Sequence, residues 1–186
     1  MDYLILALVV IAINLIPAFA PPTWAVLVMY RVSSHLAPIP LVIIGALSAA
    51  TGRYLLARAT GLLRNRLSQK VTKNLDGAAE LLTKQARNKY LSILLFGLSP
   101  FPSAQLFEAA GLIRLKLTPL ISAFFLGRIV NYAIAVAGAT TLKSIGVSDL
   151  IKEAVKSPWS IAFQIAMLYG LYLLMKVDWR KYLRSK

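Results

Sequence analysis

The chain has 186 residues, of which 58% are hydrophobic, and it carries a formal net charge of +14 with no cysteine and one histidine, His35. This composition excludes disulfides, thiolate metal sites and histidine clusters for zinc or iron. The apolar residues form blocks of about 17–25, the length that a helix needs to cross a bilayer. We therefore expect an all-helical integral membrane protein with one polytopic domain over residues 1–186, without metal or cofactor.

The first apolar stretch, residues 4–30, is interrupted by the sequence N-L-I-P-A-F-A-P-P at 14–22. Proline removes a backbone donor and clashes with the preceding turn, so Pro17, Pro21 and Pro22 mark a break between two helical arms. We expect a re-entrant helical hairpin that enters and leaves the membrane on one side. The alternative is a full span over residues 3–19 with a short return. Residues 38–57 then read as a spanning helix, and residues 3–57 form a first repeat.

A polar, basic linker follows at residues 58–89. Within it, apolar residues recur every three or four positions over 62–82, which predicts an amphipathic helix with a basic polar face. Such a helix lies along the cytoplasmic membrane interface or packs on the protein itself, and the pattern does not distinguish the two.

The second apolar stretch, residues 90–113, is broken by G-L-S-P-F-P-S at 97–103, where Pro100 and Pro102 predict another hairpin tip. Residues 117–139 read as a span, so residues 90–139 form a second repeat. A polar loop follows, with a short helix expected at 147–155. The last predicted span is 158–176, and residues 177–186 form a basic tail.

Lysine and arginine concentrate in the linker, in the exit of the second hairpin at residues 114–116, and in the tail. Basic loops stay in the cytoplasm, so we expect all three segments, and the C-terminus, on the cytoplasmic side. The second hairpin must then enter from the cytoplasm and return, while the first enters from the opposite face. We expect anionic lipid headgroups as partners of the basic face and no nucleic acid, and homo-oligomerisation stays open.

The two halves also resemble each other in sequence. Ser48-Ala49 precedes Gly52-Arg53-Tyr54 in the first helix, and Ser122-Ala123 precedes Gly127-Arg128 and Tyr132 in the second. Together with the charge argument, this predicts an inverted repeat, an arrangement in which transporters place their binding site at the interface of the repeats.

Three charged residues lie inside apolar stretches. An arginine at the centre of a membrane helix costs roughly 2.5–3.5 kcal/mol, so Arg53 and Arg128 need partners. Either could bind a phosphate or carboxylate; Arg53 could instead extend to the interface, and Arg128 could pair with Glu108. Glu108 could alternatively carry a proton.

The hairpin tips contribute polar side chains. Broken helices leave backbone N–H groups unpaired and so form natural anion sites. The polar side chains either join such a site or satisfy the backbone groups that the prolines free. They are Asn14 and Thr23 in the first hairpin and Ser99, Ser103 and Gln105 in the second. The chain has no Ser/His/Asp set, P-loop or paired carboxylates, so we expect no enzyme.

Three segments resemble the DedA superfamily, the VTT or SNARE-associated membrane proteins. They are P-A-F-A-P-P-T at the first tip, G-A-L-S-A-A-T-G-R-Y-L-L-A-R in the first helix, and S-P-F-P-S-A-Q-L-F-E-A-A-G-L in the second hairpin. The resemblance implies two re-entrant hairpins, each followed by a membrane helix, and a role in moving lipids across membranes. It also suggests the cytoplasmic membrane of a prokaryote.

The chain departs from the family pattern at its charged positions. Two acids of proton-dependent members correspond to Asn14 and Thr23, the family's Gly-Asp reads Gly52-Arg53, and the arginines of the second tip are absent. We therefore expect a divergent lipid transporter or scramblase that moves a phospholipid or polyprenyl phosphate, with Arg53 and Arg128 as its cationic site. A transporter of a small soluble anion or drug-like solute, and a non-transporting scaffold, are the alternatives.

Overall fold

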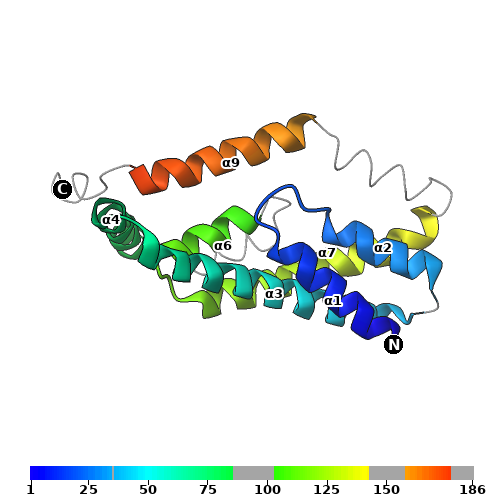
Figure 1. Cartoon of the computed structure of the whole chain (residues 1–186). Coiled ribbons are helices and arrows are strands. Elements are labelled where there is room, and N and C mark those ends of the chain that lie inside the picture. Colours follow the sequence, from blue (N-terminus) through cyan, green and yellow to red (C-terminus); the bar gives the residue numbers. More distant parts are fainter. Residues whose placement is uncertain (35, 86–102, 143–157, 177–186) are drawn as a thin grey trace.

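The computed structural model of the chain describes residues 1–34, 36–85, 103–142 and 158–176, and these residues form helices without a strand (Figure 1). The predictions for Ser99, Pro100, Pro102, the helix at 147–155 and the tail lie outside the described residues. The helices are α1 (Asp2–Leu15), α2 (Thr23–Ser33), α3 (Pro38–Leu63), the 3-10 turn η1 (Arg64–Arg66), α4 (Gln69–Gln85), α6 (Ser103–Leu112), α7 (Leu117–Leu142) and α9 (Pro158–Lys176).

The proline-rich segment separates α1 from α2, as the sequence predicts. α1 ends at Leu15, and Pro22 is the residue directly before α2. Within the turn Phe19 has a φ of 59°, a left-handed conformation that few non-glycine residues adopt. The two helices run in opposite directions on either side of this turn (Figure 1), so residues 2–33 form a helical hairpin.

α3 is the central helix of the bundle and packs against α1, α6 and α7. Two glycines make the closest of these contacts possible. A Cβ on Gly52 would lie 2.8 Å from the Ile11 carbonyl oxygen in α1, and a Cβ on Gly111 in α6 would lie 2.1 Å from the Ala57 carbonyl oxygen in α3. The backbones of α1 and α6 therefore both lie directly against α3.

α7 completes the core by packing against α3 and α2. The core contains Leu27, Leu41, Phe107 and Phe124, with the rings of Phe107 and Phe124 in a T-shaped contact at 5.2 Å between centroids. α3 thus packs against α6, and α7 packs against α2 of the first hairpin.

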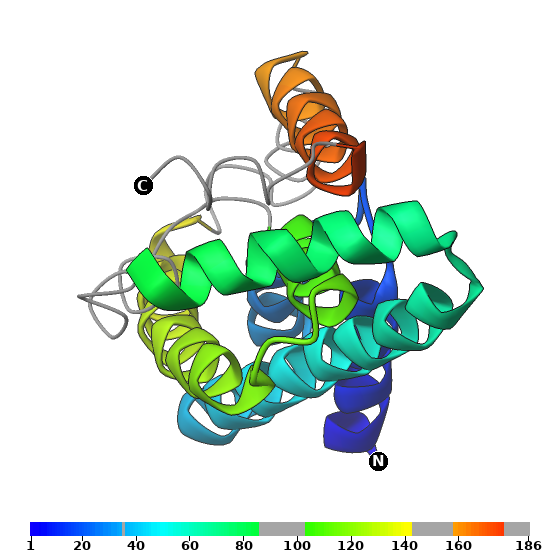
Figure 2. The same cartoon turned by 90° about the vertical axis from the view of Figure 1, so that its left-hand side faces the viewer.

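α4 crosses the end of the bundle that lies away from the N-terminus (Figure 2). Its fully buried Leu75 packs with Leu112 and Ile113, and Val71 lies at the edge of this group. The sequence allows this amphipathic helix either to lie on the membrane interface or to pack on the protein. In the structure its apolar face packs on the protein. Asn74, also on α4, donates to the carbonyls of Met175 and Lys176 at 3.1 Å each and so holds the C-terminal end of α9.

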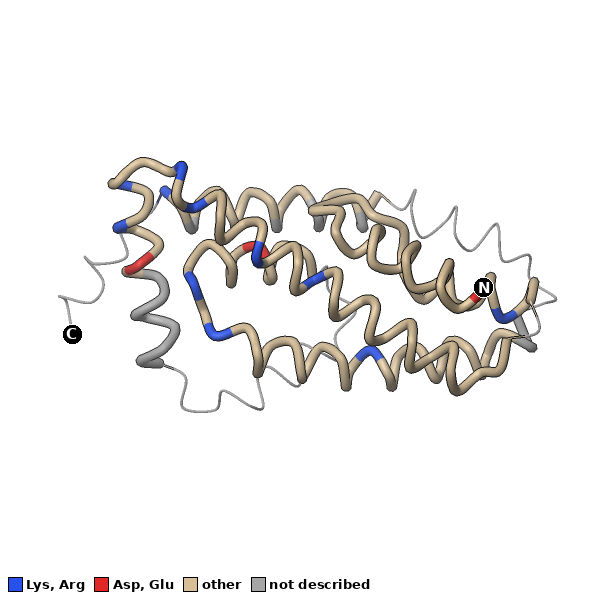
Figure 3. The backbone as a smooth tube through the Cα atoms, turned by 60° about the horizontal axis from the view of Figure 1, so that its bottom comes forward, with Lys and Arg blue, Asp and Glu red and all other residues tan. Residues whose placement is uncertain are grey.

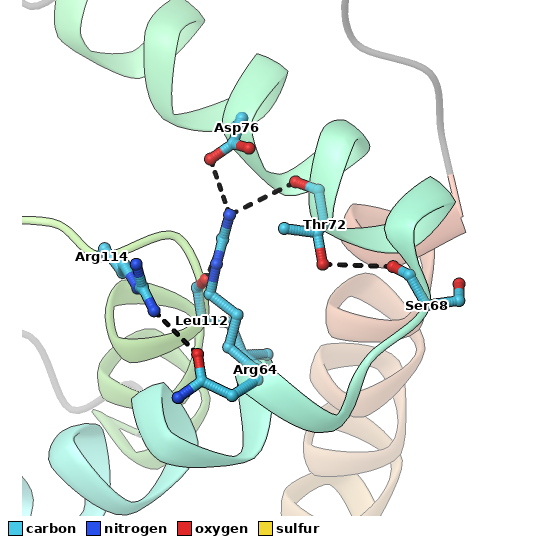
Figure 4. Close-up of polar contacts among 7 residues, drawn as sticks. Arg64, Ser68, Thr72, Asp76, Leu112 and Arg114 are labelled. Atoms are coloured by element: carbon cyan, nitrogen blue, oxygen red, sulfur yellow. Dashed lines mark hydrogen bonds and ion pairs between the residues drawn. The ribbon is translucent and has the colours of Figure 1, made fainter.

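Arg64 joins α3, α4 and α6 at the same end (Figure 4). Its guanidinium donates to the Asp76 carboxylate at 2.6 Å, to the Thr72 carbonyl at 3.4 Å and to the Leu112 carbonyl. Nearby, Arg114 donates to Asn65 at 2.8 Å. Arg64 is one of the basic linker residues from which the sequence predicts the orientation of the chain in the membrane, yet it is only 5% exposed. It stabilises the helix packing and does not belong to the exposed basic surface.

Two of the described helical segments, Pro38–Arg66 and Leu117–Ala139, are long and apolar enough to cross a membrane, with mean hydropathies of 1.6 and 1.8. α7 exposes an apolar stripe of Leu126, Val130 and Ile134, the last 67% exposed. Such a stripe suits contact with lipid tails. Lysine and arginine concentrate toward the end of the bundle away from the N-terminus (Figure 3), as the predicted charge asymmetry requires.

Candidate functional site

Asn14 connects the two arms of the first hairpin. It lies in the last turn of α1, is buried, and donates from Nδ2 to the Val10 carbonyl at 2.9 Å and to Thr23 Oγ1 at 3.0 Å. Thr23 is the first residue of α2. The two polar residues predicted for this tip therefore bond to each other and connect the end of α1 to the start of α2.

Arg53 connects the first hairpin to α6. It is 8% exposed, and its Nη1 donates to the carbonyls of Asn14 at 2.9 Å and Ile16 at 3.3 Å. These carbonyls belong to the end of α1, where no further helical turn supplies their donors. Its Nε donates to Ser103 Oγ at 3.1 Å, at the start of α6. The guanidinium of Arg53 is therefore held inside the bundle by the backbone of the first hairpin and by α6.

Gln105 approaches the same turn from α6. Its Nε2 donates to the Pro17 carbonyl at 3.4 Å, and this contact assigns the orientation of the amide. Its Oε1 then points elsewhere, and this buried oxygen has no hydrogen-bond partner among the residues that the structure describes. A buried acceptor without a donor is costly, by about 1–3 kcal/mol. Gln105 therefore retains an unused hydrogen-bonding capacity within the site.

Arg128 enters from α7 and is only partly buried. Its guanidinium carbon lies 4.7 Å from the centroid of the Phe124 ring and 5.9 Å from that of Tyr132, and such cation–π contacts hold a cation without neutralising it. Its Nε is buried, and within the described part of the chain it has no hydrogen-bond partner. The positive charges of Arg53 and Arg128 are close enough to repel each other. The two guanidinium groups therefore favour the binding of an anion beside them.

Glu108 lies buried on α6, where its charge interacts with that of Arg53. The Arg128–Glu108 ion pair, one of the alternatives for these two residues, is not formed: the one ion pair within 4.0 Å among the described residues joins Arg64 to Asp76. The site thus combines two guanidinium groups with one carboxyl group.

Tyr132 belongs to the site although the sequence suggested it only through the repeated Gly-Arg and Tyr pattern. Its side chain is 1% exposed, hydrogen-bonds to Thr23, and lies beside Arg128. It therefore ties α7 to the first hairpin.

The structure thus brings together most of the predicted site residues, which we call the central polar cluster. It comprises Asn14, Thr23, Arg53, Ser103, Gln105, Glu108 and Arg128, with Tyr132 in addition. Pro17, Pro21 and Pro22 form the turn beside it, and Ser99, Pro100 and Pro102 lie outside the described residues.

Comparison with known proteins gives no relative: no family model, no curated protein and no solved structure matches the chain.

Proposed function

We propose that the chain is a lipid transporter of the scramblase type, which moves a phosphate-bearing lipid across the bilayer along the central polar cluster. One observation carries the proposal: the turn of the first hairpin and the start of α6 converge on Arg53, and beside them lies Arg128 with a buried, unpaired Nε. A lipid phosphate is an anion that remains attached to apolar tails, so it suits a cationic site within an apolar bundle of helices.

The two arginines have different tasks in this proposal. Arg53 already donates to two carbonyls and one hydroxyl, so its hydrogen bonds hold the hairpins together. Arg128 is held by aromatic rings and retains a donor for a ligand. Guanidinium groups bind phosphate oxygens through charge-assisted hydrogen bonds. Arg128 is therefore the proposed phosphate ligand, and Arg53 positions the turn beside it.

In the membrane, both hairpins are re-entrant and the two repeats are inverted. α1 has 14 residues, about 21 Å of helix, which is too short for a hydrocarbon core of about 30 Å. α3 and α7 each have 26 residues, enough to cross it. The basic end of the bundle faces the cytoplasm of a prokaryotic cell, and the anionic headgroups of that leaflet contact it.

The resemblance of the two tips and the first helix to the DedA superfamily agrees with this function, and we propose that the chain is a divergent member. The replacement of the family's two acids by Asn14 and Thr23, which bond to each other, removes both carboxylates from the first tip. Transport in this chain is therefore proposed to run without proton coupling at that position.

The test is lipid scrambling by the purified chain in liposomes, followed by dithionite quenching of acyl-chain-labelled phospholipid. The wild type accelerates the loss of inner-leaflet fluorescence, and Arg128→Ala lowers the rate by about tenfold or more, because a charge-assisted hydrogen bond is worth about 1.5–3 kcal/mol. Arg58→Ala removes an exposed arginine of α3 outside the cluster and serves as the matched control. Equal rates in the wild type and Arg128→Ala, with both folded, would exclude the proposed role of Arg128.

The same vesicles separate the alternatives. Uptake of a soluble organic anion without lipid scrambling would identify a solute transporter, and the absence of both would identify a scaffold. The scaffold alternative predicts a closed contact in which Arg128 pairs with Glu108, and among the described residues no such ion pair lies within 4.0 Å.

A further inference from the structure

Among the described residues, two buried side-chain atoms lack a hydrogen-bond partner, and both belong to the central polar cluster. Arg128 Nε is a charged donor, and Gln105 Oε1 is a neutral acceptor. A phosphate can satisfy the first atom but not the second, because a phosphate diester has no hydrogen to donate. The site therefore has one unused group of each kind.

The acceptor is fixed in place by its neighbours. Gln105 is 3% exposed, and its Nε2 lies toward the Pro17 carbonyl. The opposite orientation of the amide would place two acceptor oxygens against each other. Two residues earlier, Ser103 Oγ accepts from Arg53. Arg128 lies over the Phe124 ring, and that ring contacts Phe107, which follows Gln105 by two residues on α6. Both unpaired atoms therefore belong to the region where α6 and α7 meet.

Resting on the proposed function, we infer that the site selects lipids whose headgroup carries a hydrogen-bond donor beside the phosphate. The phosphate binds Arg128 while an ammonium or hydroxyl of the same headgroup donates to Gln105 Oε1. Phosphatidylethanolamine and phosphatidylglycerol have such donors. Phosphatidylcholine does not, because its nitrogen is fully methylated.

Phosphatidylethanolamine and phosphatidylcholine form a matched pair of probes, since they share the phosphate and the net charge and differ in the donor. A buried acceptor left unpaired costs enough to slow the passage of the donor-free lipid by about tenfold. In liposomes that contain the wild-type chain, acyl-labelled phosphatidylethanolamine is therefore expected to cross about tenfold faster than acyl-labelled phosphatidylcholine.

Two variants assign the preference to Gln105. Gln105→Met keeps the length of the side chain but has no oxygen, and it is expected to move the two lipids at equal rates. Gln105→Glu also loses the donor to the Pro17 carbonyl, yet it keeps an acceptor, so it should retain the preference. Comparing the two variants separates loss of the acceptor from loss of the hydrogen bond to the Pro17 carbonyl.

Each outcome has one meaning. A preference that disappears in Gln105→Met and persists in Gln105→Glu supports the inference. Equal rates for the two lipids in the wild type, or a preference that survives in Gln105→Met, overturn it while leaving lipid transport intact. If the wild type moves neither lipid, the proposed function itself fails. The wild-type comparison requires no variant, so it decides the matter even if Gln105→Met does not fold.

Discussion

Arg53 Nε donates to Ser103 Oγ over 3.1 Å, across fifty positions of sequence. The same guanidinium donates to the carbonyls of Asn14 and Ile16, so one side chain holds the end of α1 and the start of α6. An arginine with this many bonds inside a bundle is part of the architecture, and this distinguishes it from Arg128, whose Nε is unpaired.

Arg53→Ala is therefore expected to lower the free energy of unfolding by at least about 3 kcal/mol, because it leaves two buried acceptors and one partly buried acceptor without a donor. Arg128→Ala should change stability far less, since it removes cation–π contacts worth about 1 kcal/mol. Thermal unfolding in detergent, with both variants beside the wild type, measures the difference. A similar loss of stability in the two variants would contradict the division of tasks.

Much of this arrangement is predictable from sequence, and the reasons are local. The break of the first hairpin falls between Leu15 and Thr23 because Pro17, Pro21 and Pro22 cannot continue a helix. The end of α3 is less well predicted: the helix continues to Leu63 rather than stopping at Ala57. The intervening residues contain no proline, and Gly61 lies inside the helix against the backbone of Gly111.

The partners of the buried arginines are not predictable in this way. Arg53 and Arg64 donate to main-chain carbonyls of Asn14, Ile16 and Leu112, and a backbone acceptor has no residue signature in the sequence. Arg64 in particular lies within a run of basic residues, where its burial is hidden by exposed neighbours. Only the packing of α4 and α6 around it determines its position.

Glycine substitutions test the close packing around α3. Gly111→Ala would place a methyl group 2.1 Å from the Ala57 carbonyl oxygen, and the main chain there cannot yield easily. We expect a loss of about 1–3 kcal/mol or more in the free energy of unfolding. Gly138→Ala is the matched control, because its methyl group would meet nothing within 4 Å and alanine favours a helix by about 1 kcal/mol. The unfolding midpoints of the two variants should therefore shift in opposite directions.

Arg64 and Asp76 form an ion pair, but we expect their substitutions to lower the free energy of unfolding by different amounts. Arg64→Met leaves the carbonyls of Leu112 and Thr72 and the Asp76 carboxylate without a donor, so we expect a loss of about 3 kcal/mol. Asp76 is 53% exposed, and water can replace its contact. Asp76→Asn should therefore cost less than about 1 kcal/mol. Equal losses from the two variants, measured by thermal unfolding, would mean that the ion pair dominates.

The exposed lysines of α4 test contact with anionic lipid. Because the apolar face of α4 is packed on the bundle, Lys70 and Lys73 face outward. Replacing both by glutamine should reduce the anionic phospholipid that purifies with the protein, by about 1 kcal/mol of binding per charge. Arg31→Gln, near the opposite end of the bundle, is the control and should retain the wild-type amount. Unchanged lipid retention in the double variant would argue against this contact.

The most direct test of the account is sided labelling of single cysteines, which the cysteine-free chain permits without prior substitutions. Cysteines at positions 2 and 33 flank the first hairpin, and cysteines at 89 and 116 flank the second. In oriented membrane vesicles, a membrane-impermeant maleimide should label the first pair from one face and the second pair from the other. If the members of either pair react from different faces, that segment spans the membrane, and two hairpins meeting from opposite sides cannot form the transport site.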